Sequence, residues 1–464
     1  MKPKNSTINS ASFRDPNGFV FTDKGIIYRQ INLPYAKHYT HLMKSGLYDK
    51  LTRAGQLISH AETEFSPPKP ENFYKVIQPK QVPFISYPYE WPFGFLKSAA
   101  LTTLSIQKKA LKLGMSLKDA SAYNIQMASS GNPILIDTLS FDIHEEGEPW
   151  VAYRQFCQHF LAPLALMAYC DVRLGQLLKV YIDGIPLDLA ARLLPLRARL
   201  NAGLLIHIHL HADVQQRYAD KAPSSSQVRA KMSKNALVGL IESLEKTVNR
   251  LAWAPAGTEW GDYYKDTNYT DTAFAQKKEI LSAWIARIKP KTVWDMGAND
   301  GSFSRLASEK GIDTLAFDID PAAVEKNYRR ICERRETNLT PLLLDLTNPS
   351  PAIGWHNRER GTIFERGSAD MVFALALIHH LAIANNVPFN MLASFFADAG
   401  DWLAIEFVPK NDSQVQRLLR SRKDIFPDYT VNDFEQAFTE EFDLIDKIQI
   451  QESERFLYLL KRKN

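Results

Sequence analysis

A turn with two glycines and an asparagine joins two acid-ended apolar runs in the C-terminal half of the sequence. Residues 292–320 read TVWDMGANDGSFSRLASEKGIDTLAFDID, with apolar strands expected to end at Asp295 and Asp318. The turn between them carries Gly297, Asn299 and Gly301. Ligands of open α/β sheets bind outside the carboxyl ends of the strands, which is where such turns and acids lie. The pattern therefore predicts a βαβ unit that binds a nucleoside-type ligand.

A dinucleotide-binding unit is the main alternative for this segment. That fingerprint requires Gly-x-Gly-x-x-Gly, in which the second glycine lets the backbone approach a pyrophosphate. Here Asn299 stands two residues after Gly297, and the next glycine is Gly301. Asparagine tolerates a positive φ better than most residues with a side chain, so the turn can still form. The spacing favours a ligand without a pyrophosphate, and an ordinary tight turn is the purely structural alternative.

The segment resembles the opening motif of class I S-adenosylmethionine (SAM) methyltransferases, acid-x-Gly-x-x-x-Gly, in Asp295, Gly297 and Gly301. The resemblance implies SAM as the cofactor. It also implies that Asp318 contacts the two ribose hydroxyls and that Asp345, after the third apolar run, contacts the adenine ring. Asn299 stands where a glycine is commoner in that family. From about residue 260 onward the chain resembles bacterial nodulation-type methyltransferases, with IHHL after the fourth strand and EFVPKND after the fifth.

Two adjacent histidines and a glutamate are the candidate catalytic residues. His379 and His380 follow the fourth apolar run, and Glu406 ends the fifth. Methyl transfer is an in-line displacement for which the protein mainly aligns donor and acceptor. A hydroxyl acceptor also needs a base, and histidine, with an unperturbed pKa of about 6.5, suits neutral pH. Packing or capping of the next helix is the structural alternative. Ahead of the first strand, the candidates for a lid are Tyr264, Tyr269 and Lys277.

A second constellation lies in the N-terminal half. Asn124 follows Asp119 by five residues, and Asp137 comes 13 residues after Asn124. Protein kinases combine a catalytic-loop aspartate, an asparagine five residues later and a metal-binding aspartate at about this distance. In that chemistry the first residue orients a hydroxyl, and the other two hold Mg²⁺, which prefers oxygen ligands. This half therefore resembles the kinase-like superfamily, which implies ATP and Mg²⁺ as ligands if it is active.

The kinase pattern is incomplete. No Gly-x-Gly-x-x-Gly loop precedes the expected hairpin, and Arg29 is the candidate substitute for the usual strand lysine. Leu117-Lys118 replaces the histidine or glycine expected before the catalytic aspartate, and Thr-Leu follows Asp137 in place of Phe-Gly. Phosphotransfer, nucleotide sensing and substrate docking all stay open for this half.

The remaining sequence predicts the elements that position these residues. Residues 1–220 are expected to form an α+β kinase-like domain, followed at 221–258 by a linker and a bridging helix. Residues 259–464 alternate strands and helices, which predicts a Rossmann-like, mostly parallel doubly wound sheet. Within the first part, the expected elements are a hairpin at 18–31 with its turn at Asp23-Lys24-Gly25, a helix within 39–62, and extended runs at 74–77 and 82–87.

Composition narrows the function classes. The 464 residues carry 56 basic and 52 acidic side chains, a net charge of +4 without a basic stripe, so nucleic acid is not the expected partner. Three cysteines without disulfide or metal spacing indicate a reducing cytoplasm. No apolar run suits a signal peptide or a membrane span. One further group is expected to lie on a helix without binding metal: His207, His209 and His211.

The sequence thus predicts a cytoplasmic SAM-dependent methyltransferase acting on a small-molecule, sugar or glycan/lipid acceptor. Two alternatives stay open. One is a bifunctional kinase-methyltransferase on a glycan-type acceptor, and the other is a non-catalytic scaffold that senses SAM.

Overall fold

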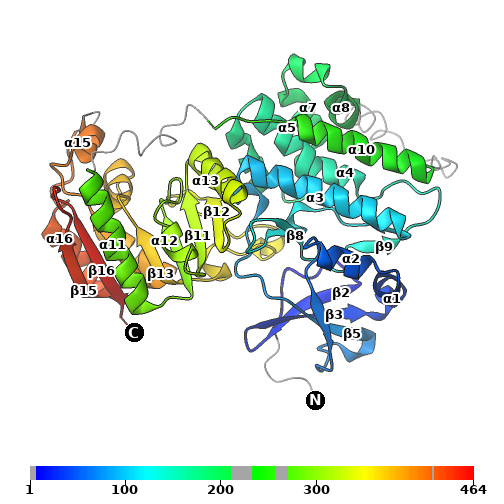
Figure 1. The fold of residues 1–464 in the computed structure, drawn as a ribbon, viewed down its shortest axis with the longest axis horizontal. Helices are drawn as coiled ribbons and strands as arrows, with labels where there is room; N and C mark the ends of the chain where they lie inside the picture. The colour runs from blue at the N-terminus through cyan, green and yellow to red at the C-terminus, as the bar shows by residue number, and fades with distance from the viewer. Residues whose placement is uncertain (1–6, 211–231, 256–269, 421–422, 464) are drawn as a thin grey trace. The chain divides into compact units, whose positions relative to one another are not determined.

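The chain forms two compact units in the computed structural model (Figure 1). The structure describes residues 7–210, 232–255, 270–420 and 423–463. The first unit comprises residues 1–128, 132–254 and 352–360, and the second comprises 129–131, 255–351 and 361–464. Residues 352–360 thus belong to the first unit, although the chain on both sides of them belongs to the second. The predicted lid tyrosines Tyr264 and Tyr269, together with His211 and most of the predicted linker, lie outside the described residues.

The first unit begins with a five-stranded antiparallel sheet of order β1-β2-β3-β5-β4. The predicted hairpin is confirmed, because Lys24 and Gly25 form its turn with positive φ values of 49° and 80°. The strands are β1 (Thr7–Ile8), β2 (Gly18–Asp23), β3 (Ile26–Asn32), β4 (His60–Thr63) and β5 (Phe73–Pro79).

Two sequence expectations for this region are wrong. The helix expected within 39–62 is two helices and a strand, since Gly46, with a φ of 78°, separates α1 (Ala36–Lys44) from α2 (Leu47–Arg53) and β4 follows. Residues 82–87 form no strand in the described chain. Instead, the backbone N–H of Ser86 donates to the side chain of Gln126 at 2.8 Å.

A largely helical part follows in the first unit. The long helix α3 (Phe93–Lys112) leads into two short antiparallel pairs: β6 (Met115–Leu117) with β9 (Phe141–Ile143), and β7 (Ile125–Met127) with β8 (Pro133–Leu135). The loops of these pairs carry Asp119, Asn124 and Asp137. The other helices are α4 (Tyr153–Phe156), α5 (Ala162–Tyr169), α6 (Leu177–Val180), α7 (Leu187–Leu193), α8 (Ala202–Leu204) and α10 (Lys234–Arg250).

Helix α10, which the sequence analysis expected as a bridge, packs along α3 within the first unit. Lys108 pairs with Glu245 at 2.8 Å, and the ammonium of Lys97 donates to the carbonyls of Asn249 and Leu251 at 2.9 and 2.7 Å. The ammonium of Lys97 thus caps the carboxyl end of α10, where backbone carbonyls without a helical partner attract positive charge.

The second unit contains a seven-stranded sheet of order β12-β11-β10-β13-β14-β16-β15 (Figure 1). Strands β10 to β14 are parallel, and β16 runs antiparallel to both β14 and β15. The predicted mostly parallel sheet is therefore confirmed. The strands are β10 (Thr292–Met296), β11 (Asp313–Asp318), β12 (Leu339–Leu343), β13 (Ala369–Ala374), β14 (Gly400–Phe407), β15 (Phe442–Gln449) and β16 (Phe456–Arg462).

The edge strand β15 was not predicted. It is largely exposed beyond Phe442, so it shows little of the apolar alternation that identifies a half-buried strand. The described helices of this unit are α11 (Asp271–Ile288), α12 (Arg305–Ser308), α13 (Pro321–Arg334), α14 (Phe389–Ala399), α15 (Ser413–Leu419) and α16 (Val431–Glu441).

Local signals explain how the helices reach the sheet. Thr270 caps α11 by accepting from the Ala273 N–H at 3.2 Å, and Asp320 caps α13 by accepting from Ala322 at 2.7 Å. The apolar face of α11 packs on the sheet, with Leu281 in one buried cluster with residues of β10 and β13. None of the described helices has both the length and the apolarity of a membrane span.

The strand order places a crevice at β10. This strand has β11 on one side and β13 on the other, so the direction of winding reverses there. In open parallel sheets the ligand site lies at such a switch point, outside the carboxyl ends of the strands.

Candidate functional site

The carboxyl ends of β10 to β13 and the loops after them surround a cavity of about 390 Å³. Seven residues predicted from sequence line it: Lys277, Asp295, Gly297, Asn299, Asp318, Asp345 and His380. Three other predicted residues are not among its lining: Gly301, His379 and Glu406. Most of the apolar lining was not predicted from the sequence; it includes Phe303, Ile319, Leu344, Leu346, Leu375 and Leu377. Those residues follow strands as ordinary apolar positions and carry no separate sequence signal.

The turn after β10 is built on left-handed backbone. Gly297, Asn299 and Gly301 have φ values of 81°, 50° and 76°. The Asn299 N–H donates to Oδ2 of Asp318 at 2.7 Å, which ties the turn to the end of β11. Asparagine thus fulfils here the conformational demand that a glycine usually meets.

Gly301 allows a close approach that a side chain would prevent. A Cβ there would lie 2.5 Å from Nδ2 of Asn327 and 2.8 Å from Nη1 of Arg305. We expect Gly301→Ala to destabilise the second unit by about 2 kcal/mol or more, because the left-handed strain of about 1–2 kcal/mol adds to this clash. Urea unfolding followed by hydrogen exchange of β10 and β11 measures the loss.

Gly311 offers the matched control for that substitution. Its φ is 78°, but a Cβ there would meet nothing within 4 Å. Gly311→Ala should therefore show the backbone strain alone. Equal losses in the two variants would contradict a packing role for Gly301.

Two aspartates at the cavity are buried and strongly perturbed. Asp295 accepts from the Ser304 hydroxyl at 2.6 Å, and burial raises its pKa to about 7, an effect that this bond and Lys277 oppose. Burial also raises the pKa of Asp318 to about 6, although the N–H groups of Asp320 and Asn299 donate to it at 2.8 and 2.7 Å. At pH 7 the Asp318 carboxyl is therefore mostly ionised.

The residues present fit a SAM-type nucleoside. Asp318 accepts from the backbone N–H groups of Asp320, Asn299 and Ile319, and its two oxygens, with about four lone-pair sites, keep capacity for a donor such as a ribose hydroxyl. Asp345 accepts from the N–H and hydroxyl of Thr347 with one oxygen, at 2.9 and 2.6 Å. Ile319, Leu344 and Leu346 supply the apolar surface that a flat purine ring needs.

The two histidines after β13 differ in their access to the cavity. His380 lines it, whereas His379 is 1% exposed and both its ring nitrogens lack partners among the described residues. The ring centroids are 4.1 Å apart. Burial lowers the pKa of His380 to about 4 and that of His379 well below its ordinary value, so both rings are neutral at pH 7. A neutral imidazole can accept a proton.

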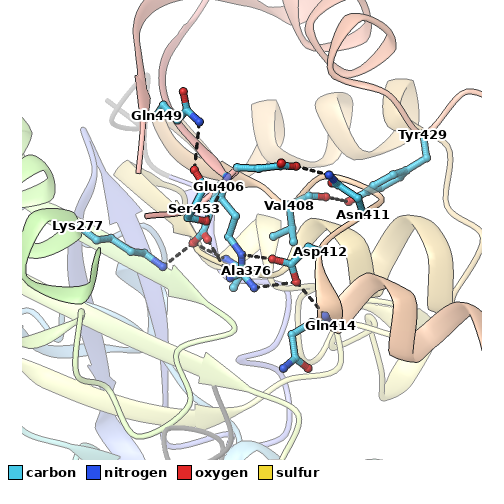
Figure 2. A network of polar contacts seen from close by, with 12 residues as sticks. Lys277, Ala376, Glu406, Val408, Asn411, Asp412, Gln414, Tyr429, Gln449 and Ser453 are labelled. Carbon is cyan, nitrogen blue, oxygen red and sulfur yellow. Dashed lines mark hydrogen bonds and ion pairs between the residues drawn. The ribbon is translucent and has the colours of Figure 1, made fainter. Parts of the chain in front are cut away.

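Glu406 lies in a buried network of ionic groups (Figure 2). Its Oε2 is 2.5 Å from the ammonium of Lys277 and accepts from the Ala376 N–H at 3.1 Å. Arg455 reaches its other oxygen at 3.2 Å and also pairs with Asp412 at 2.8 Å. Burial lowers the pKa of Lys277, against the attraction of Glu406. The network joins α11, β14, the start of α15 and the turn before β16.

Lys277, a predicted lid residue, is thus buried on α11 and lines the cavity. Arg455 and Asp412 were not predicted as functional residues from the sequence. Asp412 is visible in the sequence as the N-cap of α15, where it accepts from the Gln414 N–H at 2.8 Å. The pairing of these residues depends on tertiary structure.

The kinase-like residues Asp119, Asn124 and Asp137 also lie close together, in the first unit. Asn124 hydrogen bonds to Asp119, whose pKa is raised mainly by burial and further by the negative charge of Asp137. Arg29 pairs with Asp137 at 2.6 Å, and its guanidinium reaches Asp15 at 3.8 Å. The contacts of Asp137 with Arg29 and with the Leu139 N–H, the latter at 2.7 Å, both fall on Oδ1. The positive charge of the guanidinium beside this carboxylate opposes the binding of Mg²⁺ there.

The last predicted feature is the group of histidines at positions 207, 209 and 211. His207 lies on a helical segment, as expected, and its two ring nitrogens lie 2.8 Å from the Tyr153 hydroxyl and 2.9 Å from that of Ser243. In the part of the chain that the structure describes, no group of three or more His, Cys, Asp or Glu residues is placed to hold a metal ion.

The sheet order and the cavity at its switch point define the second unit as a Rossmann-like α/β domain. The chain as a whole belongs to the family of the nodulation protein NoeA of Rhizobium meliloti (strain 1021). It is 34% identical to that protein over 460 residues, which are 98% of this chain and 96% of the relative. No family model matches the chain.

Two of the solved structures that are similar to parts of the chain are a methyltransferase and a kinase-methyltransferase. Magnesium protoporphyrin IX methyltransferase from Synechocystis PCC 6803, with bound S-adenosylhomocysteine (SAH), is 17% identical over 44% of this chain and 93% of its own, with a TM-score of 0.32. The bifunctional kinase-methyltransferase WbdD is 16% identical over 41% of this chain, which spans 38% of WbdD, with a TM-score of 0.27.

Proposed function

We propose that the second unit is a SAM-dependent methyltransferase acting on a small-molecule, sugar or glycan/lipid acceptor. The observation that carries this proposal is the cavity at the switch point, which gathers Asp295, Asp318, Asp345 and His380 from the ends of four strands. The relative in this family is named a nodulation protein, and this name supports an acceptor molecule with a role in nodulation. The acceptor atom stays open.

Each cavity residue has a role that follows from its chemistry. Asp318 accepts hydrogen bonds from the ribose hydroxyls. Asp345 and the apolar residues around it contact the adenine ring. SAM supplies an electrophilic methyl group on a sulfonium. His380, neutral at pH 7 and in the cavity wall, takes the proton that a hydroxyl acceptor releases. Asp295 and the turn after β10 hold the cavity's shape through Ser304 and Asp318.

Calorimetry with SAM and SAH tests the cofactor site. Asp318→Ala should weaken SAM binding by about 10- to 150-fold, because a hydrogen bond to a charged group contributes about 1.5–3 kcal/mol. Asp313→Ala, at the opposite end of the same strand β11, is the matched control and should leave the affinity unchanged. Unchanged affinity in Asp318→Ala would remove this site assignment.

An acceptor panel separates catalysis from sensing. Formation of SAH with at least one acceptor supports the methyltransferase. SAM binding without SAH formation over small-molecule, sugar and glycan/lipid acceptors would favour the SAM-sensing scaffold instead.

For the first unit we propose a kinase-like fold that serves as a docking module. The proximity of Asp119, Asn124 and Asp137 supports the kinase-like fold. The ion pair of Arg29 with Asp137 is largely buried, with side chains 12% and 15% exposed, so the carboxylate needed for Mg²⁺ is already neutralised. Binding of Mg-ATP in calorimetry would favour the bifunctional kinase-methyltransferase over this docking role.

A further inference from the structure

A second cavity, of about 510 Å³, lies in the first unit beside Asp119. It is lined mainly by polar and charged side chains from several separate stretches of the chain, including residues 118–124 and 151–159. The segment 352–360, far away in sequence, contributes Glu359 and Arg360. The basic residues of the lining are Arg14, Lys118, Arg154 and Arg360.

Residues 352–360 are held in place at this cavity. The guanidinium of Arg14 donates to both carboxylate oxygens of Glu359, at 3.0 and 2.9 Å. Ile353 and Arg360 exchange two backbone hydrogen bonds, at 3.0 and 3.1 Å, which closes the segment into a loop. The Arg360 guanidinium lies 4.3 Å from the ring centroid of Tyr123, a favourable cation–π distance. These contacts place the Arg360 guanidinium at the wall of the cavity without a ligand.

The cavity presents more positive than negative charge to a ligand. Glu359 and Asp183 both pair with Arg14, at 2.9 and 3.6 Å. Asp119 is the remaining acidic residue of the lining. The ammonium of Lys118 lies 3.9 and 4.0 Å from the carboxylates of Asp15 and Asp142, which is beyond hydrogen-bond distance. Its N–H groups can therefore still donate to a ligand.

Two buried nitrogen atoms of the lining have no hydrogen-bond partner among the described residues, Nδ1 of His159 and Nε of Arg360. His159 is 2% exposed, and burial lowers its pKa to about 3, so its ring is neutral. A buried polar atom without a partner is unfavourable. Both atoms are shielded from the cavity surface, so a ligand gains these hydrogen bonds only when the two side chains turn toward it.

We propose that this cavity binds a small hydroxyl-bearing anion of the sugar phosphate or sugar acid class. Arg360, Arg154 and Lys118 bind the anionic group, since guanidinium and ammonium groups form charge-assisted hydrogen bonds with phosphate and carboxylate oxygens. Asp119 accepts from a ligand hydroxyl, and the neutral ring of His159 donates to or accepts from another. The inference rests on the docking role proposed for the first unit, and it requires neither methyl transfer nor phosphotransfer.

Titration of the full-length chain with four probes tests the ligand class. We expect glucose 6-phosphate or glucuronic acid to bind, and glucose and inorganic phosphate to bind at least tenfold more weakly than the better of the two. The arm that binds identifies the anionic group. Failure of both anionic sugars to bind, or equally tight binding of inorganic phosphate, would overturn the proposal. Mg-ATP is titrated separately. Its binding would contradict the docking role proposed for the first unit, whereas the sugar titrations would still test the ligand class of this cavity.

Substitutions locate the site. Arg360→Gln and Arg154→Gln should each weaken binding of the better probe about tenfold or more, by loss of a charge-assisted hydrogen bond. Arg154 is exposed, so its variant keeps the test valid if Arg360→Gln disturbs the loop. Arg358→Gln, exposed on the same segment and outside the cavity lining, is the matched control. Unchanged binding in both test variants, with thermal unfolding as in the wild type, would place the ligand elsewhere.

Discussion

Replacing Glu406 by leucine should destabilise the second unit by about 3–5 kcal/mol. The carboxylate is fully buried and carries ion pairs with Lys277 and Arg455, at 2.5 and 3.2 Å. Removing one partner of a buried ion pair is strongly destabilising, because the other charge is left without compensation. Here two cations lose the carboxylate, and the Ala376 N–H loses its acceptor.

Asp401 provides the matched control on the same strand β14. It pairs with Arg462 at 2.8 Å, but the two side chains are 59% and 44% exposed. Exposed ion pairs contribute about 0–1 kcal/mol, so Asp401→Leu should have little effect. The measurement is urea unfolding followed by hydrogen exchange of β14 peptides, since a chain of two units does not unfold in one step. Similar losses in both variants would show that the Glu406 network contributes little.

The same network separates structure from catalysis. Glu406 was predicted to share the catalytic task, yet it is not among the cavity lining and its oxygens bind Lys277, Arg455 and the Ala376 N–H. We therefore expect that Glu406→Gln, which keeps the shape and part of the hydrogen bonding, loses stability more than it loses turnover per folded molecule.

Replacing His380 by alanine should lower methyl-transfer turnover by about 10²-fold. This is the lower end of the usual 10²–10⁴-fold contribution of a general base, because a pKa of about 4 makes the imidazole a weak base at pH 7. SAM affinity should change little, because the proposed arrangement assigns the contacts with SAM to Asp318 and Asp345. SAH formation with a working acceptor gives the turnover, and calorimetry gives the affinity. A variant with normal turnover would exclude His380 as the base.

The pH profile adds an independent readout. Burial lowers the pKa of His380 to about 4, so the ring stays neutral as the pH falls through the range in which an ordinary histidine is protonated. We expect kcat at saturating SAM to stay level between about pH 5 and 8 and to fall only as the pH approaches 4. The value of kcat/KM for SAM should already fall below about pH 6, where Asp318, with a pKa raised by burial to about 6, becomes protonated. His379→Leu, which changes a buried ring outside the cavity lining, is the control and should keep this profile.

The sequence predicted the second unit better than the first because its signals are local. An apolar run that ends in Asp295 or Asp318, and a turn that needs positive φ at Gly297, can be identified from neighbouring residues alone. In the first unit, the positive φ of Gly46 divided an expected helix into two. A single glycine within an apolar period is a weak signal, since many helices tolerate one.

The sequence by itself determined that the acid-ended strands run parallel. It therefore also determined that the predicted cofactor residues meet at the carboxyl ends of these strands. Only the tertiary structure decided the partners of the charged groups. Glu406 meets Lys277 and Arg455, and Arg29 neutralises Asp137, across separations that no local pattern encodes. The same holds for Arg360, which reaches the first unit from within the sequence of the second. Side-chain pairing depends on distance after folding, whereas strand and turn formation depends on adjacent residues, so only the latter could be predicted from the sequence.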